Sequence, residues 1–385
     1  MKKEIKITIE QDYFDILQTF KKNNDIKSNS IAIEKILFDN YANKIEKPFE
    51  YFTINNRRYL GSKTKILDFI QKNIDKHIPH YNSFLDIFAG TGVVANHFNN
   101  KKTKIITNDL LFSNYIIHYA FLSDDEYDKN KINELLEYFN NITPVDNYFS
   151  ENFGDKFFSL NVAKKIGTIR EEIEKLTEQI SKREKYILIT SLIYSIDKIA
   201  NTCGHYDAFR KNSSMPDDFR MKHLDIDNSD NSANMIFNSD ANKLITEIEP
   251  VDILYLDPPY NSRQYISAYH LIENLAQWNK PKVEGVASKM INRKDYNSEY
   301  CLRTAIESFE DLITKAKAKY IILSYSDMAK KGNDRSNARM SDEDIIRVLQ
   351  NKGELVIESI KHKPFSTGKT NLETHNERLF ICKTY

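Results

Sequence analysis

Short apolar runs recur along the chain, and each ends at or just before a glycine, proline or aspartate. They read "SFLDIF" from residue 83, "KIITN" from 104, "DILYLD" from 252 and "YIILSYSD" from 320. Runs of this length are typical of buried strands. Helical patterns lie between them, and "ELVIESIKHK" and "ERLFICKTY" predict two closing strands. The order predicts an open α/β sheet with helices packed on it.

The first 45 residues form a separate pattern. Apolar and polar residues alternate in "EIKITIE", which predicts a half-buried strand, and two helical patterns follow, near 12–23 and 30–41. A strand and two helices resemble a ribbon-helix-helix module, in which two chains pair their strands and lay them in a major groove. That reading implies a dimer. The alternative is an N-terminal cap that packs on the main domain.

Residues 113–235 form a long, polar, helix-rich stretch between two groups of strands. Its loop "CGHYDAFRKNSSMPDDFRMKHLD" mixes aromatic and basic side chains, which are the residue types that contact bases and phosphates. The candidate contacts in this loop are His205, Tyr206, Arg210 and Lys211. The alternative is an ordinary insertion whose charges are solvated.

The segment "FAGTG" (88–92) follows the first apolar run and precedes a helical pattern. Strand, glycine turn and helix open nucleotide-binding sheets, because Gly90 and Gly92 let the backbone approach a ligand closely. Asp109 ends the next strand about twenty residues further on, where an acid binds the hydroxyls of a ribose. The pair predicts a ligand that contains adenosine.

The segment "RYLGSK" (58–63) precedes the glycine turn and opens a helical pattern. Lys63 and Lys65 fall in the first turn, where they oppose the helix dipole, so they suggest an anionic group nearby. The alternative is a basic turn exposed to solvent.

The apolar run at 252–256 stops abruptly at "DPPY" (257–260). In open α/β sheets ligands bind beyond the carboxyl ends of strands, so this segment should face one. Pro258 and Pro259 stiffen the loop and hold the Pro258 carbonyl beside the Asp257 carboxylate. These two acceptors can each take one hydrogen from an amine conjugated to an aromatic ring, such as the exocyclic nitrogen of adenine. Tyr260 offers a flat face on which that ring can stack.

Composition narrows the class of protein. Lys+Arg and Asp+Glu each number 55 in 385 residues, so any surface for nucleic acid must be local. Three scattered cysteines indicate neither a disulfide framework nor a zinc site, and no apolar run reaches membrane-spanning length. We expect a soluble, cytoplasmic protein that needs no metal and binds no membrane.

The three motifs "RYLGSK", "FAGTG" and "DPPY", in this order, resemble the adenine-specific DNA methyltransferases of the Dam-like alpha group. "DPPYNSRQYISAYHLIENLAQW" and "NTCGHYDAFRK" are most similar to the FokI-type methylases of restriction-modification systems. The resemblance implies a Rossmann-like S-adenosylmethionine-dependent methyltransferase sheet in 50–112 and 236–385. It also implies a helical target-recognition domain in 113–235, and it leaves the extension 1–45 outside the family.

The resemblance further implies a role for each motif residue. S-adenosylmethionine would be bound by Tyr59, Lys63, Asp86, Phe88, Gly90, Gly92, Asp109 and Asp240. The catalytic residues would be Asp257, Pro258, Pro259 and Tyr260, acting on N6 of an adenine flipped out of double-stranded DNA. A cognate restriction endonuclease acting on the same site is the partner that such methylases imply.

Further basic residues are candidate DNA contacts. Arg263 follows "DPPY", and Lys361, Lys363 and Lys369 cluster in "KHKPFSTGKT" between the last two strands. In an otherwise neutral chain, this cluster should contact DNA phosphates.

Two other functions stay open. One is a methyltransferase that acts on RNA or on a protein glutamine, although those enzymes usually carry Asn in place of Asp257. The other is a DNA-binding repressor with a degenerate methylase body, which the intact glycine turn, ribose acid and "DPPY" argue against.

Overall fold

The structure is a computed structural model that describes residues 11–23, 26, 28, 29, 32, 33, 51–228, 230–326, 339–362 and 375–385. Its contacts divide the chain into two units, Met1–Glu50 and Tyr51–Tyr385. In the first unit, helix α1 (Gln11–Asn23) confirms the first helical pattern. The strand over 4–10 and most of the second helix fall outside the described residues, so the module and the cap both stay predictions.

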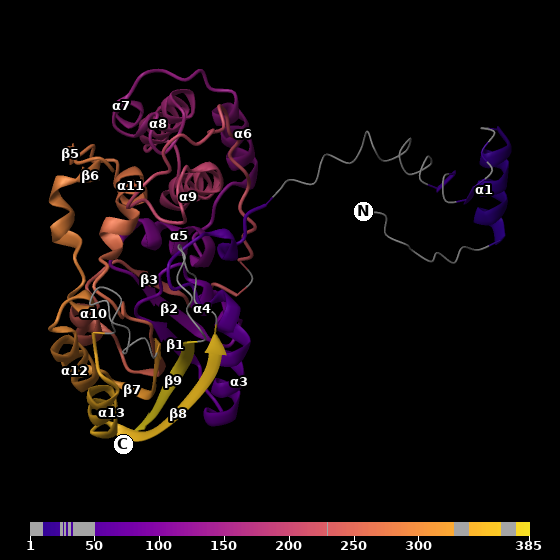
Figure 1. Ribbon diagram of the computed structural model, residues 1–385. Coiled ribbons are helices and arrows are strands. Elements are labelled where there is room, and N and C mark those ends of the chain that lie inside the picture. Colours follow the sequence, from indigo (N-terminus) through magenta and orange to yellow (C-terminus); the bar gives the residue numbers. More distant parts are fainter. Residues whose placement is uncertain are drawn as a thin grey trace. The chain divides into compact units, whose positions relative to one another are not determined.

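The second unit is built on a seven-stranded sheet with the order β3-β2-β1-β4-β7-β9-β8 (Figure 1). The strands are β1 (Ser83–Asp86), β2 (Lys104–Asn108), β3 (Met235–Phe237), β4 (Val251–Leu256), β7 (Ala318–Ser326), β8 (Gly353–His362) and β9 (His375–Thr384). Neighbouring strands are parallel from β3 to β7, whereas β9 is antiparallel to both β7 and β8. This confirms the α/β class and each strand that the apolar runs predict.

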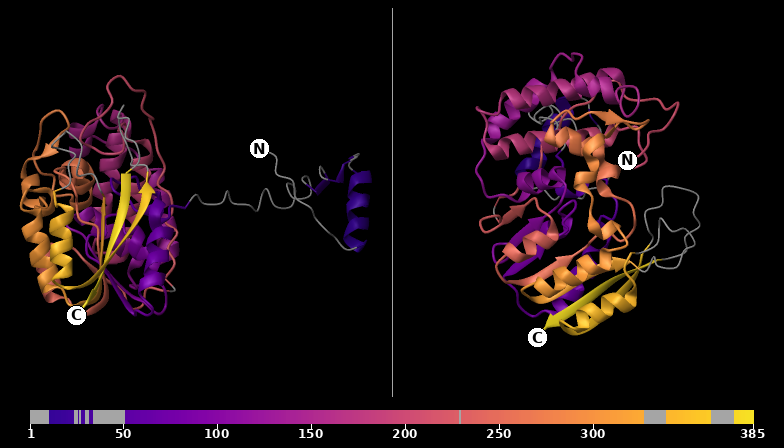
Figure 2. Two further views of the ribbon diagram at one scale, coloured as in Figure 1. Left: turned by 60° about the horizontal axis from the view of Figure 1, so that its bottom comes forward. Right: turned by 90° about the vertical axis from the view of Figure 1, so that its left-hand side faces the viewer.

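Helices cover both faces of the sheet, as the left view of Figure 2 shows. One face carries α3 (Leu67–His77), α4 (Val93–Phe98) and α5 (Phe112–Leu122); the other carries α10 (Ala241–Glu247), α12 (Ala305–Lys315) and α13 (Asp342–Gln350). Successive residues of a strand point to opposite faces. Thus Phe84 packs in the first layer and Leu85 in the second.

A helical layer lies beyond the carboxyl ends of the parallel strands (Figure 1). Its helices are α6 (Lys129–Asn140), α7 (Tyr148–Phe153), α8 (Leu160–Lys175), α9 (Lys182–Ile199) and α11 (Tyr265–Gln277), which is followed by the short strands β5 (Val283–Glu284) and β6 (Lys289–Met290). One buried apolar cluster runs through this layer and one face of the sheet. The stretch 113–235 therefore shares its core with the sheet, and its role in target recognition stays a prediction.

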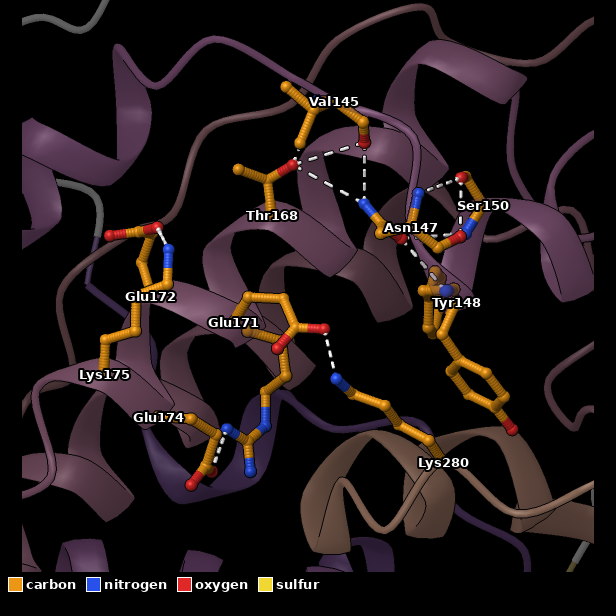
Figure 3. Close-up of polar contacts among 12 residues, drawn as sticks. Val145, Asn147, Tyr148, Ser150, Thr168, Glu171, Glu172, Glu174, Lys175 and Lys280 are labelled. Atoms are coloured by element: carbon orange, nitrogen blue, oxygen red, sulfur yellow. Dashed lines mark hydrogen bonds and ion pairs between the residues drawn. The ribbon is translucent and has the colours of Figure 1, made fainter.

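Polar contacts join α8 to the end of α11 (Figure 3). The Lys280 ammonium, just after α11, lies 2.5 Å from a carboxylate oxygen of Glu171 on α8. In the same view, Asn147 caps the neighbouring helix α7 and donates a hydrogen bond to the Val145 carbonyl. The buried Arg170 side chain donates to the carbonyls of Leu275 and Ala276 at distances of 2.8 and 3.1 Å. These bonds anchor the last turn of α11 in the helical layer.

Short 3₁₀ helices also occur in the second unit, at Ile54–Asn56, Thr64–Ile66, Ile291–Tyr296 and Glu299–Cys301. Within the described ranges, no helix combines the length and the apolar character that a membrane span requires.

Candidate active site

A pocket of about 920 Å³, part of it open to solvent, lies at the carboxyl ends of β1, β2 and β4. From β1 the sheet order continues to β2 on one side and to β4 on the other. Open α/β sheets bind ligands at such a reversal point. The predicted site residues that line the pocket are Tyr59, Lys63, Asp86, Phe88, Gly90, Asp109, Asp240, Asp257 and Pro259. The fold thus brings the three motifs to one place.

The glycine turn has two positive φ angles, 53° at Gly90 and 76° at Gly92. A Cβ on Gly92 would lie 2.8 Å from Cδ2 of His118, and Gly92 does not line the pocket. The packing of His118 is therefore one reason for a glycine at this position, and a contact between Gly92 and the cofactor stays a prediction. Burial lowers the pKa of His118 to about 4, so its ring is neutral, and Nε2 lies 3.0 Å from the Gly90 carbonyl, to which it can donate.

Asp109 is already engaged by the backbone of the turn. Its two carboxylate oxygens accept hydrogen bonds from the N–H groups of Gly90, at 2.9 Å, and Leu111, at 2.8 Å. Burial raises the pKa of Asp109 to about 6, and the hydrogen bonds from Leu111, Asn114 and Gly90 oppose that rise. The carboxylate is held rigidly at the pocket wall, with lone pairs left over for a ligand.

Asp86 is 1% exposed, and within the described part of the chain its Oδ1 has no hydrogen-bond partner. Burial raises the pKa of Asp86 well above its usual range, and the charges of Asp257 and Asp109 raise it further. An unpaired buried acceptor that lines a pocket fits a ligand with a hydrogen-bond donor. Asp240 instead caps α10, accepting from the Lys243 N–H at 3.1 Å. No metal cluster of three or more His, Cys, Asp or Glu is found in the described residues.

Lys63 points into the pocket and not to solvent. Its Nζ lies 2.8 Å from Oδ1 of Asp257, and its side chain is only 5% exposed. The solvated-turn alternative is therefore wrong for Lys63, although Lys65 is exposed. Burial raises the pKa of Asp257 to about 6, and the Lys63 charge opposes that rise. The anionic group that the basic turn suggested is the carboxylate of "DPPY".

The "DPPY" loop is anchored at the end of β7. The Tyr260 carbonyl accepts a hydrogen bond from the Arg339 N–H at 2.9 Å, and the Tyr260 ring meets Tyr325 edge to face at 6.0 Å. The Lys63 ammonium lies 5.9 Å from the centre of the Tyr260 ring. The loop therefore presents its carboxylate and its aromatic ring to the same cation.

Aromatic side chains line one wall of the pocket, and of its tyrosines only Tyr59 was predicted from the sequence. Tyr59 stacks on Tyr269 at 4.3 Å, and the Tyr269 hydroxyl accepts the Leu60 N–H at 2.7 Å. Tyr265 lines the pocket beside them. Tyr265 and Tyr269 are four residues apart on α11, and this spacing, which places two side chains on one helix face, could have revealed them. Tyr300, which packs edge-on against Phe88 at 4.8 Å, follows no such pattern.

The predicted DNA contacts fall into different environments. Arg210, Lys211 and Arg263 are exposed, and Arg263 is close enough to His205 for its charge to help lower the pKa of that ring, after the larger effect of burial. The structure contradicts the role of Tyr206, which is 3% exposed and donates its hydroxyl to Asp197 at 2.6 Å. Because its ring is in the core, it is not available to a base or a phosphate.

The basic cluster near the C-terminus is not tested by the structure. Lys361 lies on β8, but its side chain, Lys363 and Lys369 are outside the described residues. Their contact with DNA phosphates stays a prediction.

Sequence comparison identifies the family. Residues 59–333 match the family described as D12 class N6 adenine-specific DNA methyltransferase. "Modification methylase StsI" of Streptococcus sanguinis is 33% identical over 348 residues, which are 85% of this chain and 51% of that protein. "Type II methyltransferase M.FokI" of Planomicrobium okeanokoites is 31% identical over 77% of this chain and 47% of its own length. "Type II methyltransferase M.NlaIII" of Neisseria lactamica is 29% identical over 82% of this chain and 95% of its length.

The chain thus spans about half the length of StsI and FokI and nearly all of NlaIII. The family match covers "RYLGSK" from Tyr59 onward, the glycine turn and "DPPY", the same segments that meet in the pocket. The chain therefore belongs to the D12 class of N6 adenine-specific DNA methyltransferases.

Proposed function

We propose that this protein methylates N6 of adenine at a specific sequence in double-stranded DNA, with S-adenosylmethionine as the methyl donor. The observation that carries this proposal is that the glycine turn, Asp109 and the "DPPY" segment line one and the same pocket. A site for an adenosine-containing ligand and a site for an amine on an aromatic ring then share one space.

The pocket residues fit the methyl donor. Asp109 would accept the ribose hydroxyls, while the unpaired Oδ1 of Asp86 would accept a donor such as the amino group of the methionine end. Tyr59 and Phe88 would flank the ligand with apolar surface, and Asp240 would lie at the adenine end. When bound, S-adenosylmethionine supplies an electrophilic methyl group on a positively charged sulfur.

The "DPPY" residues would prepare the target. Asp257 and the Pro258 carbonyl accept the two hydrogens of the adenine amino group, which draws its lone pair out of the ring, and Tyr260 stacks on the base. Positive charge develops on this nitrogen during the reaction, and the Asp257 carboxylate would stabilise that charge. Lys63 occupies only one oxygen of the carboxylate, Oδ1, so Oδ2 stays open to the amine.

The chain's contribution is mainly positioning. The adenine must leave the duplex, at a cost of a few kcal/mol. The Asp257 carboxylate and the Pro258 carbonyl, held rigidly, would increase the rate of transfer by orienting the amino nitrogen toward the methyl group. The exposed side chains of Arg210, Lys211 and Arg263 would contact the DNA near the opening. The names of the relatives, a modification methylase and a Type II methyltransferase, support a restriction-modification role, in which a cognate endonuclease would recognise the same site.

A filter assay with tritiated S-adenosylmethionine tests the proposal on DNA, RNA and protein substrates in parallel. We expect label on DNA alone, and its position follows from sequencing the methylated bases in a host that expresses the gene. Asp257→Ala should remove transfer and retain cofactor binding. Transfer to RNA or to protein glutamine with unmodified DNA would replace the proposal by the alternative substrate.

A further inference from the structure

Arg57 is a buried cation directly behind the cofactor side of the pocket. Its side chain is 0% exposed, and its Nη1 donates to Oδ1 of Asn114 at 2.6 Å. The guanidinium carbon lies 5.0 Å from the centre of the Tyr59 ring and 5.7 Å from that of Tyr269. A charge so completely removed from water is costly, so its presence calls for a reason.

Stability does not supply that reason. The Arg57 Nε atom lies 3.6 Å from Oδ2 of Asp197, which is an ion pair but too long for a good hydrogen bond. Nε and Nη2 of Arg57 and Oδ2 of Asp197 all lack hydrogen-bond partners within the described residues. Well-packed apolar side chains often stabilise a core as well as a buried ion pair does, and incomplete pairing weakens the ion pair further.

Asn114 shows what Arg57 controls. Its Nδ2 donates to the Tyr59 hydroxyl at 3.0 Å, and its side chain also hydrogen-bonds to the Asp109 carboxylate. The two ends of an amide differ, since the oxygen only accepts and the nitrogen only donates. Because the Arg57 guanidinium is a donor, it fixes the amide oxygen on its own side and turns the amide nitrogen toward the pocket. Arg57 thereby sets the donor that holds Tyr59 and Asp109.

The other side of Arg57 leads to the helical layer. Asp197 lies on α9, and its Oδ1 accepts the hydroxyl of Tyr206. The backbone of Tyr206 is bonded to α11, through Ala268 O at 2.7 Å and His270 Nε2 at 2.9 Å. The loop that carries His205 and Arg210 is thus joined through Asp197 to the same guanidinium.

We propose that Arg57 is a positioning residue for the cofactor. Through Asn114 it holds Tyr59 and Asp109 in the geometry that binds S-adenosylmethionine, and through Asp197 it makes that geometry depend on the loop at Tyr206. Cofactor affinity and DNA affinity are then coupled, and each ligand tightens the other by the same factor. This inference rests on the proposed function.

The test measures the Kd of S-adenosylmethionine by calorimetry, with and without a DNA duplex that contains the sequence which the protein methylates. Arg57→Met keeps the length of the side chain and removes its charge and donors. We expect about a tenfold weaker Kd, the effect of one charge-assisted hydrogen bond, and a KM for the cofactor that rises more than kcat falls. Arg57→Lys keeps the positive charge and loses the planar guanidinium with its several donors. Its Kd for the cofactor should lie between that of the wild type and that of Arg57→Met. Tyr206→Phe should reduce the factor by which DNA tightens cofactor binding.

Arg183→Met is the matched control. Arg183 is also 0% exposed and donates to the Ala120 carbonyl at 3.1 Å. Its partners among the described residues do not include Asn114 or a residue that lines the pocket. It should lower stability as Arg57→Met does and leave the Kd unchanged. An Arg57→Met protein with reduced stability and wild-type Kd would overturn the inference. If Arg57→Met does not fold, two other results together would overturn the inference. They are a wild-type Kd for the cofactor in Arg57→Lys, and a wild-type effect of DNA on that Kd in Tyr206→Phe. Failure of the wild-type protein to bind the cofactor would instead refute the proposed function.

Discussion

The Nζ atom of Lys63 lies 2.8 Å from Oδ1 of Asp257, in the interior of the pocket. The sequence motifs assign the two residues to different tasks, the first to the cofactor and the second to the target amine. Their contact means that the charge state of Asp257 depends on Lys63.

Lys63→Met should shift the pH dependence of methyl transfer. In the proposed mechanism, Asp257 must be ionised to accept the target amine; burial raises its pKa to about 6 and the Lys63 charge opposes the rise. The wild-type rate should therefore fall as the pH decreases through about 6. Without the Lys63 charge the pKa of Asp257 rises further, so the acidic limb should move upward by roughly one unit.

Single-turnover rates between pH 5 and 9 measure this limb. Lys65→Met, which alters an exposed neighbour, should leave it in place. A Lys63→Met enzyme with reduced rate but an unmoved limb would show that Lys63 does not control the ionisation of Asp257.

Gly92→Ala should destabilise the second unit more than an ordinary left-handed glycine does. Its Cβ would lie 2.8 Å from the buried His118 ring at a φ of 76°, so strain and overpacking add, and we expect a loss of roughly 2–4 kcal/mol. Gly285→Ala is the control, because its φ is 71° and a Cβ there meets nothing within 4 Å. It should cost only about 1 kcal/mol. Urea unfolding of both variants measures their free energies of unfolding. Equal decreases in the two variants would exclude a contribution from the contact with His118.

Arg263→Ala combined with Arg210→Ala should weaken binding to any duplex. If each side chain neutralises one phosphate, the slope of log K against log salt should decrease by about 0.9 per residue. Lys175→Ala is a suitable control, since that lysine is exposed on α8 and paired with Glu172 (Figure 3). Fluorescence anisotropy over a salt series gives the slopes. A slope unchanged from wild type would remove both arginines from the DNA surface.

Deletion of residues 1–45 separates the two readings of the N-terminal unit. The contacts divide the chain at Glu50, and the family match begins at Tyr59, so we expect a soluble protein that still transfers methyl groups. If the segment is a ribbon-helix-helix module, the deletion should lose dimerisation or change DNA affinity, as light scattering and anisotropy would detect. An insoluble or strongly destabilised protein would favour the cap.

Much of the architecture could be predicted because it depends on local patterns. The apolar runs locate each strand of the sheet that they predict. The rule that ligands bind at the carboxyl ends of strands places Asp109 and Asp257 at one pocket from the sequence alone. The motif around Tyr59 and Lys63 needed the family resemblance.

The rest depends on tertiary contacts that no local pattern encodes. Tyr206 lies in a loop whose aromatic and basic composition is typical of DNA contacts, but its hydroxyl is buried and hydrogen-bonds to Asp197. Gly92 resembles a ligand-binding glycine, but it makes room for His118, which lies on a helix of a later segment. In the sequence nothing distinguishes Arg57 from its neighbour Arg58. Only the fold shows that Arg57 is enclosed by Tyr59, Tyr269 and Asp197.

The unpaired oxygen of Asp86 also has a consequence for the lifetime of the protein in a cell. An unsatisfied buried acceptor costs about 1–3 kcal/mol of stability. A ligand that supplies a donor to Oδ1 removes this cost and adds stability according to its concentration relative to Kd. If the proposed methyl donor is this ligand, its supply raises the fraction of the protein that escapes unfolding and proteolysis. Thermal unfolding with and without S-adenosylmethionine measures the size of this protection.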